Sequence, residues 1–236
     1  MDSLEKILIK RLQEAMNDQG ENLTVDGDLG PKTLAATEKY NFKIIATRKE
    51  ENKKSSSPPW YLFALKFKGK KETDPEFAKM MVPKWKLVGL NLGTIAANWA
   101  AWCGLAMAVA LAGVGVDYAK NGASAKNWDQ YGVTIDWKKD GIPQGAIVRI
   151  NHNLNCASSA GNHVAQANGD CTSQDLLKSG ASIDLYGGNQ GNTWKVSTFS
   201  AKEICAVRWP KDYEKPGAVL ASKNCTSRGA SSETTQ

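Results

Sequence analysis

Residues 98–113 read NWAAWCGLAMAVALAG, and this stretch decides how the second half of the chain is expected to fold. It predicts a buried core helix from about Ala100 to Leu111, with Cys103 near the start of that helix. The positive end of a helix dipole favours the thiolate form of a cysteine in this position. Free cysteine is also a common small core residue, so the stretch alone leaves both roles open.

The stretch belongs to a longer uncharged segment, which runs from Leu87 to the residue before Asp117. Its length would suffice to cross a bilayer. However, Asn91, Thr94 and Asn98 lie in its first half, and five glycines are spread along it. A core helix therefore accounts for the apolar residues better than a membrane span, and we expect no span.

The pattern changes to strands after Gly141, with short apolar and β-branched runs separated by Gly and Asn turns. The runs are AIVRI (146–150), HVAQA (163–167), SIDLY (182–186), TWKVSTF (193–199) and ICAVRW (204–209). Helices are predicted before them, at 60–67 and 75–82. Helices first and strands afterwards predict an α+β domain, in which N-terminal helices pack on an antiparallel sheet.

Residues 1–45 are expected to form a small helical bundle of their own. The first segment has apolar residues at the spacing of an amphipathic helix. These are Leu4, Ile7, Leu8, Leu12 and Ala15. A turn with Gly27 and Gly30 follows, and then a second helix from Pro31, which suits a first helical position, to about Ile45.

A polar segment, residues 46–59 (ATRKEENKKSSSPP), is typical of a linker. The second domain is therefore expected over residues 60–215, and residues 216–236 have the composition of a disordered tail. The N-terminal residues MDSLEKILIKRL lack the apolar core and cleavage site of a secretory signal, so synthesis in the cytoplasm is expected.

The chain carries 30 Lys and Arg against 24 Asp and Glu, and the net charge of +6 points to an anionic partner. Basic and aromatic residues do not interleave along one element, which argues against nucleic acid. A monomer is the default expectation.

Residues 25–40, VDGDLGPKTLAATEKY, resemble the peptidoglycan-binding domain built from a short three-helix bundle. The resemblance rests on the pair Asp26–Gly27, on the Gly-Pro step that starts at Gly30, and on Thr33. It implies that Asp26, Gly27 and Gly30 take part in binding bacterial peptidoglycan. A generic helical hairpin with an Asp-Gly turn is the alternative interpretation.

Residues 60–210 resemble the CHAP and NlpC-type cysteine amidohydrolases, which have a papain-like fold. Six segments occur in the order of that family. They are WYLFALKFKGKKE (60–72), WC with its apolar helix (102–111), IPQGAIVRI (142–150), GNHVAQANG (161–169), YGGNQGN (186–192) and VRWP (207–210). The third segment departs from the family, because Gln144-Gly145-Ala146 replaces Pro-Gly-Asp. The resemblance implies a papain-like domain without a cofactor.

The same resemblance implies catalytic roles for Cys103 and His163. Cys103 would attack an amide carbonyl, and His163 would accept the thiol proton and pass it to the leaving amine. His163 opens a predicted strand and is expected to be held rigidly, whereas the other histidine, His152, lies in a loop and is expected to be less constrained.

A third polar group must orient the imidazole of His163. Asn189 of the GGNQ turn best matches the family position, with Gln190 and Asp184 as alternatives. The backbone N–H of Cys103 is expected to donate to the oxyanion. The second donor is not assigned, although two residues lie close in the chain, Asn98 and Trp99. Trp102 either lines the substrate groove or is a core aromatic residue.

The other four cysteines allow two interpretations. Two disulfides, Cys156–Cys171 and Cys205–Cys225, would leave Cys103 as the free thiol. Alternatively, a zinc ion would be held by His152, Cys156, His163 and Cys171. The spacing of these four residues matches no common zinc pattern, so we expect no metal.

Together the two resemblances predict a phage endolysin, which is a peptidoglycan hydrolase. The bond cut would be that of an N-acetylmuramoyl-L-alanine amidase or of a peptidoglycan endopeptidase. Such an enzyme is made in the host cytoplasm and reaches the periplasm and cell wall after a holin opens the membrane. The alternatives are a secreted antibacterial wall amidase toxin and a catalytically decayed wall-binding or virion structural protein.

Overall fold

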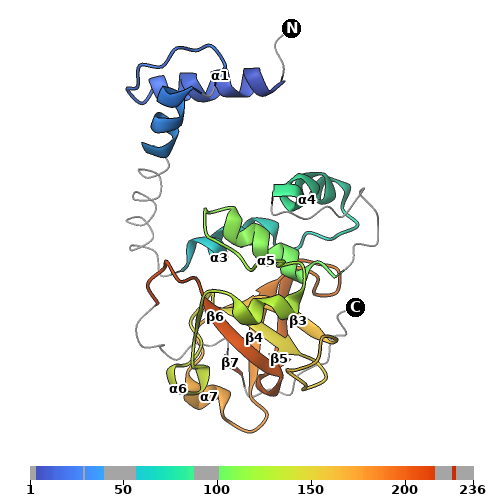
Figure 1. Cartoon of the computed structure of the whole chain (residues 1–236). Helices are drawn as coiled ribbons and strands as arrows, with labels where there is room; N and C mark the ends of the chain where they lie inside the picture. Colours follow the sequence, from blue (N-terminus) through green and yellow to red (C-terminus); the bar gives the residue numbers. More distant parts are fainter. Residues whose placement is uncertain (1–3, 29, 40–56, 88–100, 216–224, 227–236) are drawn as a thin grey trace. The chain divides into compact units, whose positions relative to one another are not determined.

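The computed structural model describes residues 4–28, 30–39, 57–87, 101–215 and 225–226. The chain divides into two compact units, Met1–Ser56 and Ser57–Gln236 (Figure 1). The second unit begins at Ser57 rather than at Trp60, because Pro59 is already the first residue of a helix and the Ser57 hydroxyl donates to Gln144.

The first unit consists of helix α1 (Leu4–Asn17), a long turn and a helix over residues 31–39. Its small core contains Met16, Leu23 and Ala36. The prediction of two helices around a turn is confirmed, while the predicted continuation over 40–45 lies outside the described residues, as does linker segment 46–56.

The second unit is an α+β domain, as the sequence predicts (Figure 1). Its helical segments are α3 (Pro59–Ala64), η1 (Leu65–Phe67), α4 (Pro75–Leu87), α5 (Cys103–Ala112), η2 (Ala125–Gln130), α6 (Trp137–Asp140), α7 (Ser173–Leu176) and η3 (Ala201–Glu203). Its strands are β1 (Val133–Thr134), β2 (Ile147–Asn151), β3 (Asn162–Ala167), β4 (Ser182–Gly187), β5 (Lys195–Ser200), β6 (Ile204–Trp209) and β7 (Cys225–Thr226).

The strands form one antiparallel sheet in the order β1-β6-β2-β3-β4-β5, with β7 paired to β4. The five strands predicted from the sequence are β2 to β6, and their bounds agree closely with the prediction. β7 was not predicted, because the composition of residues 216–236 indicated a disordered tail. Pairing of Cys225 with Ile183 corrects this expectation for two residues of the tail.

One edge of β3 creates the space in which the site forms. β2 pairs with β3 along its length, from Asn162 to Gln166. On the other edge β4 pairs with β3 only at Gln166 and Ala167. Within the described part of the chain, the edge beside His163 therefore carries no strand, and helix α5 packs against β3 instead.

Helix α5 is the core helix that the sequence predicts, and each residue from Cys103 to Leu111 is buried. It begins at Cys103, so the sulfur-bearing residue is the first of the helix. Figure 1 shows α3 and α5 over one end of the sheet, and α6 and α7 at the other. No helix among the described residues is both long enough and apolar enough to cross a membrane.

Candidate functional site

A cavity of about 390 Å³ contains the two residues predicted to be catalytic, Cys103 and His163. Asn189 also lines it, although the three residues come from α5, β3 and the turn after β4. The rest of the lining is mostly small or polar. It consists of Ala101, Ala123, Ser124, Ala125, Lys126, His152, Ser159, Gly161 and Asn162. The structure thus brings Cys103 together with residues that follow it by 60 positions and more in the sequence.

The Cys103 thiol lies against the free edge of β3, where it accepts a hydrogen bond from the backbone N–H of Val164. The N–H groups of Gly104 and of Cys103 itself also point at the sulfur, as expected at the first residue of a helix. Burial raises the pKa of the thiol, and these three donors act in the opposite direction. The larger effect is burial, so the resting sulfur is a neutral thiol.

His163 is also held in its neutral form. Burial lowers the pKa of its imidazole to about 3, and the positive charge of His152 contributes in the same direction. The ring lies nearly parallel to that of Phe199, with 5.6 Å between the ring centroids. A neutral imidazole can accept a proton, so this arrangement provides a general base beside a protonated nucleophile rather than a preformed ion pair.

The GGNQ turn reaches the site because its glycines permit close packing. A Cβ on Gly188 would lie 2.2 Å from Cζ3 of Trp102, and a Cβ on Gly187 would lie 2.7 Å from Cβ of Ala165. Asn189 then adopts a left-handed backbone conformation with φ of +59°, which asparagine tolerates better than most residues. The two glycines place the turn against α5, and the asparagine turns the chain into the cavity.

Gln190 and Asn189 occupy different positions relative to His163. Gln190 is fully buried, and its Nε2 lies 3.4 Å from His163 Nε2. Asn189 lines the cavity instead. The third candidate, Asp184, accepts a hydrogen bond from Thr198 on β5 and does not line the cavity. The geometry therefore favours Gln190, the second choice from the sequence, as the residue that orients the ring.

The Gln190 amide also bears on the tautomer of His163. Nε2 of Gln190 faces both His163 Nε2 and the carbonyl of Leu185, at 3.4 and 3.3 Å. Its Oε1 is buried without a hydrogen-bond partner among the described residues. Rotation of the amide by half a turn would let Oε1 accept from His163 Nε2–H and would leave Nδ1 as the proton acceptor, but it would break the hydrogen bond from Gln190 to the Leu185 carbonyl.

Trp102 is a core aromatic residue rather than part of a groove. It is fully buried and packs against Phe77 and Trp194, with ring centroids 5.9 and 6.1 Å away. Its indole N–H donates to the Glu72 carboxylate at 2.9 Å. The interpretation that Trp102 lines a substrate groove is therefore wrong, because its side chain is fully buried.

Glu72 is a buried carboxylate that the sequence did not single out as a site residue. Burial raises its pKa, and the Trp102 hydrogen bond acts against that shift. It does not line the cavity but supports the residue before Cys103. The two residues considered near the oxyanion, Asn98 and Trp99, lie outside the described part of the chain.

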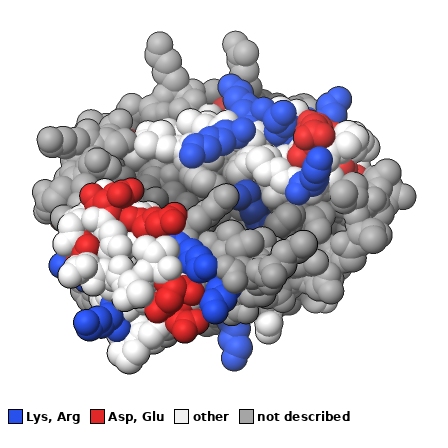
Figure 2. Space-filling view, turned by 90° about the horizontal axis from the view of Figure 1, so that it is seen from above, with Lys and Arg blue, Asp and Glu red and all other residues white. Residues whose placement is uncertain are grey.

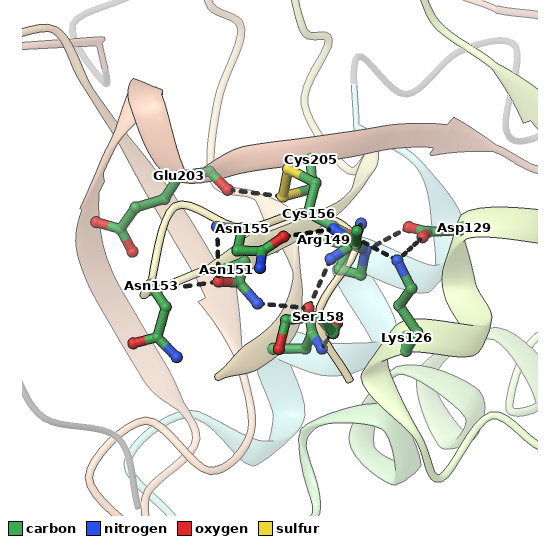
Figure 3. Close-up of a disulfide and its surroundings, with 12 residues drawn as sticks. Lys126, Asp129, Arg149, Asn151, Asn153, Asn155, Cys156, Ser158, Glu203 and Cys205 are labelled. Carbon is green, nitrogen blue, oxygen red and sulfur yellow. Dashed lines mark hydrogen bonds and ion pairs between the residues drawn. A yellow bond between two sulfur atoms is a disulfide. The ribbon is translucent and has the colours of Figure 1, made fainter. Parts of the chain in front are cut away.

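The loop after β2, residues 152–161, forms one wall of the cavity together with the start of β3. A disulfide joins Cys156 of this loop to Cys205 on β6 (Figure 3). Buried Arg149 forms an ion pair with Asp129. It also donates hydrogen bonds to the carbonyl of Cys156 in the loop and to Asn162 Oδ1 at the start of β3. Polar contacts and a covalent bond therefore fix this wall.

The observed disulfide corrects the predicted pairing. Cys156 pairs with Cys205, not with Cys171, and Cys205 is therefore not bonded to Cys225. Cys171 is disulfide-bonded as well, and Cys103 is the free cysteine. The sequence could not show this, because strand order brings β6 beside β2 and thus Cys205 beside the loop. The alternative zinc set is not assembled, since two of its thiols are in disulfides.

His152 was expected to be a loosely held loop residue, and this expectation is wrong. Its Nδ1 lies 2.9 Å from Glu203 Oε2, and its ring lies 6.4 Å from that of His163. Both imidazoles contact the Phe199 ring, at 5.9 and 5.6 Å. No sequence pattern indicated this pair, because Glu203 follows His152 by about 50 positions.

A second, larger concavity of about 650 Å³ lies on the far side of Lys126, which lines both spaces. It is bordered by residues 116–121 and 210–212, and none of the described residues in its lining is a cysteine or a histidine. The larger concavity therefore offers no alternative pair of nucleophile and base among its described residues.

On the face shown in Figure 2, Lys and Arg side chains of the described residues are interspersed with Asp and Glu.

In the first unit, the Asp26–Gly27 turn is tied to α1 through a buried glutamine. Gln13 Nε2 donates to Asp26 Oδ1 at 2.9 Å, and Gln13 Oε1 accepts from the Gly27 N–H. Gly27 has φ of +82°, and a Cβ there would meet Lys6 at 2.5 Å. These contacts give Asp26 and Gly27 a structural role in the turn. Gly30 has no atom within 4 Å of where a Cβ would lie.

Comparison with known proteins adds no relative: no family model, no curated protein and no solved structure matches the chain.

Proposed function

We propose that this protein is a peptidoglycan hydrolase that cuts an amide bond with Cys103 as nucleophile and His163 as base. One observation carries the proposal. Cys103, the free cysteine among the described residues, lines one cavity together with a buried, neutral histidine, although the two come from separate elements. A nucleophile at a helix start beside a base on the adjoining strand is also the arrangement of a papain-like fold.

The reaction follows from the protonation states. The imidazole of His163 takes the thiol proton as the Cys103 sulfur attacks the amide carbonyl, so an S–C bond forms and the carbonyl oxygen becomes an oxyanion. The oxyanion then collapses, the C–N bond breaks, and the imidazolium returns its proton to the leaving amine. Water activated by His163 hydrolyses the thioester and regenerates the thiol.

The substrate class is supported by the two segments that resemble wall-active proteins. The bond is either that between muramic acid and L-alanine or a peptide bond of the stem, as in an endolysin. The disulfides support action outside the cytoplasm, because such bonds persist in oxidising compartments. We therefore propose that the protein acts in the periplasm and cell wall after release.

A turbidity assay on purified peptidoglycan tests the proposal. Wild type is expected to clear the suspension, and Cys103→Ala and His163→Ala are expected to lose at least ~1000-fold of that rate. Lys178→Gln, which changes an exposed ion pair at the end of α7, serves as the matched control and is expected to retain full activity. Equal clearing by wild type and Cys103→Ala, or clearing by neither, would contradict the cysteine mechanism. Mass spectrometry of the released fragments would name the bond.

A further inference from the structure

The lining of the catalytic cavity is unevenly charged. Two of its residues can carry a positive charge, Lys126 and His152, and none of the described lining residues is acidic. Their acidic partners, Asp129 and Glu203, are not among the lining residues. A cavity lining that carries cationic groups, with no carboxylate among its described residues, favours an anionic ligand group.

His152 and Lys126 differ in how they are held. The Lys126 ammonium contacts both Asp129 and the carbonyl of Cys156, so its donors are directed at the protein. His152 is engaged by Glu203 through Nδ1, and Nε2 is on the opposite side of the ring. A carboxylate on one ring nitrogen fixes the ring orientation and makes a donor of the other nitrogen once the ring is protonated.

The surroundings of His152 are those of a positioned side chain. Its ring contacts Phe199, which also supports His163, so both imidazoles rest on one aromatic surface. The Cys156–Cys205 disulfide joins the loop that follows His152 to the strand that follows Glu203 (Figure 3). Both members of the pair are thus fixed close to that covalent link.

We propose that His152, oriented by Glu203, binds a free carboxylate of the substrate next to the amide that Cys103 attacks. This inference rests on the proposed function, because the wall peptide is the ligand that would present such a group. The α-carboxylate of its D-glutamate stands next to the first amide bonds of the stem. A peptide with that carboxylate converted to an amide keeps the shape and loses the charge.

The test compares two ligands that differ only in this group, N-acetylmuramoyl-L-alanyl-D-glutamate and N-acetylmuramoyl-L-alanyl-D-isoglutamine. Their binding to the full chain is measured by calorimetry in a Cys103→Ala background, which prevents turnover. The acid is expected to bind about tenfold more tightly than the amide, the size of one charge-assisted hydrogen bond. In Cys103→Ala/His152→Gln this ratio is expected to fall to about one, with affinity for the amide ligand kept.

Glu203 is a positioning residue and has its own variants. Glu203→Gln is expected to reduce the acid-to-amide ratio, and Glu203→Asp is expected to restore part of it. Lys178→Gln, at an exposed lysine just after α7, is the charge control and should leave the ratio unchanged. If His152→Gln does not fold, Glu203→Gln carries the same comparison.

Three results would overturn the inference: equal affinity of the parent for both ligands, no binding of either, or equal weakening of both by His152→Gln. The cleavage reaction is judged separately, by wall clearing with wild type. A protein that binds with the expected preference but does not clear the wall would refute the proposed hydrolase and leave the carboxylate site standing.

Discussion

The two sides of the cavity that contains Cys103 and His163 are built in opposite ways. The side with Cys103 is made by close packing, in which the glycines of the GGNQ turn lie against Trp102 and its neighbours. The side with His152 is made by polar contacts, the Arg149 ion pair and a disulfide. Packing places the Cys103 thiol, while directional and covalent bonds place the opposite wall.

Breaking the disulfide should have the largest effect on stability at neutral pH. Cys156→Ser/Cys205→Ser opens a link between residues 49 positions apart, which corresponds to about 4 kcal/mol of the free energy of unfolding by loop entropy. Urea denaturation of this variant and of wild type measures the difference. A loss below about 1 kcal/mol would mean that the Arg149 contacts hold the wall without the covalent bond.

Gly188→Ala attacks the packed side instead. The added methyl would lie 2.2 Å from Trp102 and 2.6 Å from Ala106, and overpacking of this kind costs about 2–3 kcal/mol. Gly180→Ala is the control, because no atom lies within 4 Å and only its φ of +71° opposes a side chain, at about 1 kcal/mol. Equal denaturation midpoints for the two variants would show that the turn is not tightly packed.

The orienting residue can be identified by two single substitutions. Gln190→Ala removes the amide that lies beside His163 Nε2. It is expected to lower the wall-clearing rate about 30-fold, which corresponds to an increase of about 2 kcal/mol in the activation free energy. Asn189→Ala changes the cavity lining and is expected to have a smaller effect. A larger loss for Asn189→Ala would restore the sequence-based first choice.

Acid should lower the free energy of unfolding through His163, which lies on the packed side. The pKa of its imidazole is about 3 in the folded protein, where the ring is buried, and 6.5 in the unfolded chain, where it is not. Between these two pH values the unfolded chain therefore binds the proton more readily than the folded protein. Stability is therefore full above pH 6.5 and falls with decreasing pH towards 3, by about 1.4 kcal/mol per pH unit. Denaturation at pH 7, 6, 5 and 4 is compared for wild type and His163→Gln. The same pH dependence in both would assign the acid sensitivity to other groups.

The same contrast explains what the sequence could predict. Local apolar patterns predict α5 and the strands β2 to β6, and the two glycines of GGNQ indicate a closely packed turn. The wall depends on strand order. β6 returns beside β2, and only this pairing brings Cys205 to Cys156 and Glu203 to His152. No local pattern encodes such contacts, so the disulfide partners and the role of His152 were missed.

The smallest predicted effect isolates one hydrogen bond within the packed side. Trp102→Phe removes the indole N–H that donates to buried Glu72, whereas Trp194→Phe removes an N–H that is buried without a partner among the described residues. The rings are neighbours and both are fully buried, so their packing losses are similar. Trp102→Phe should therefore cost about 1 kcal/mol more in urea denaturation. Equal costs would mean that Glu72 is protonated and contributes no charge-assisted bond beneath Cys103.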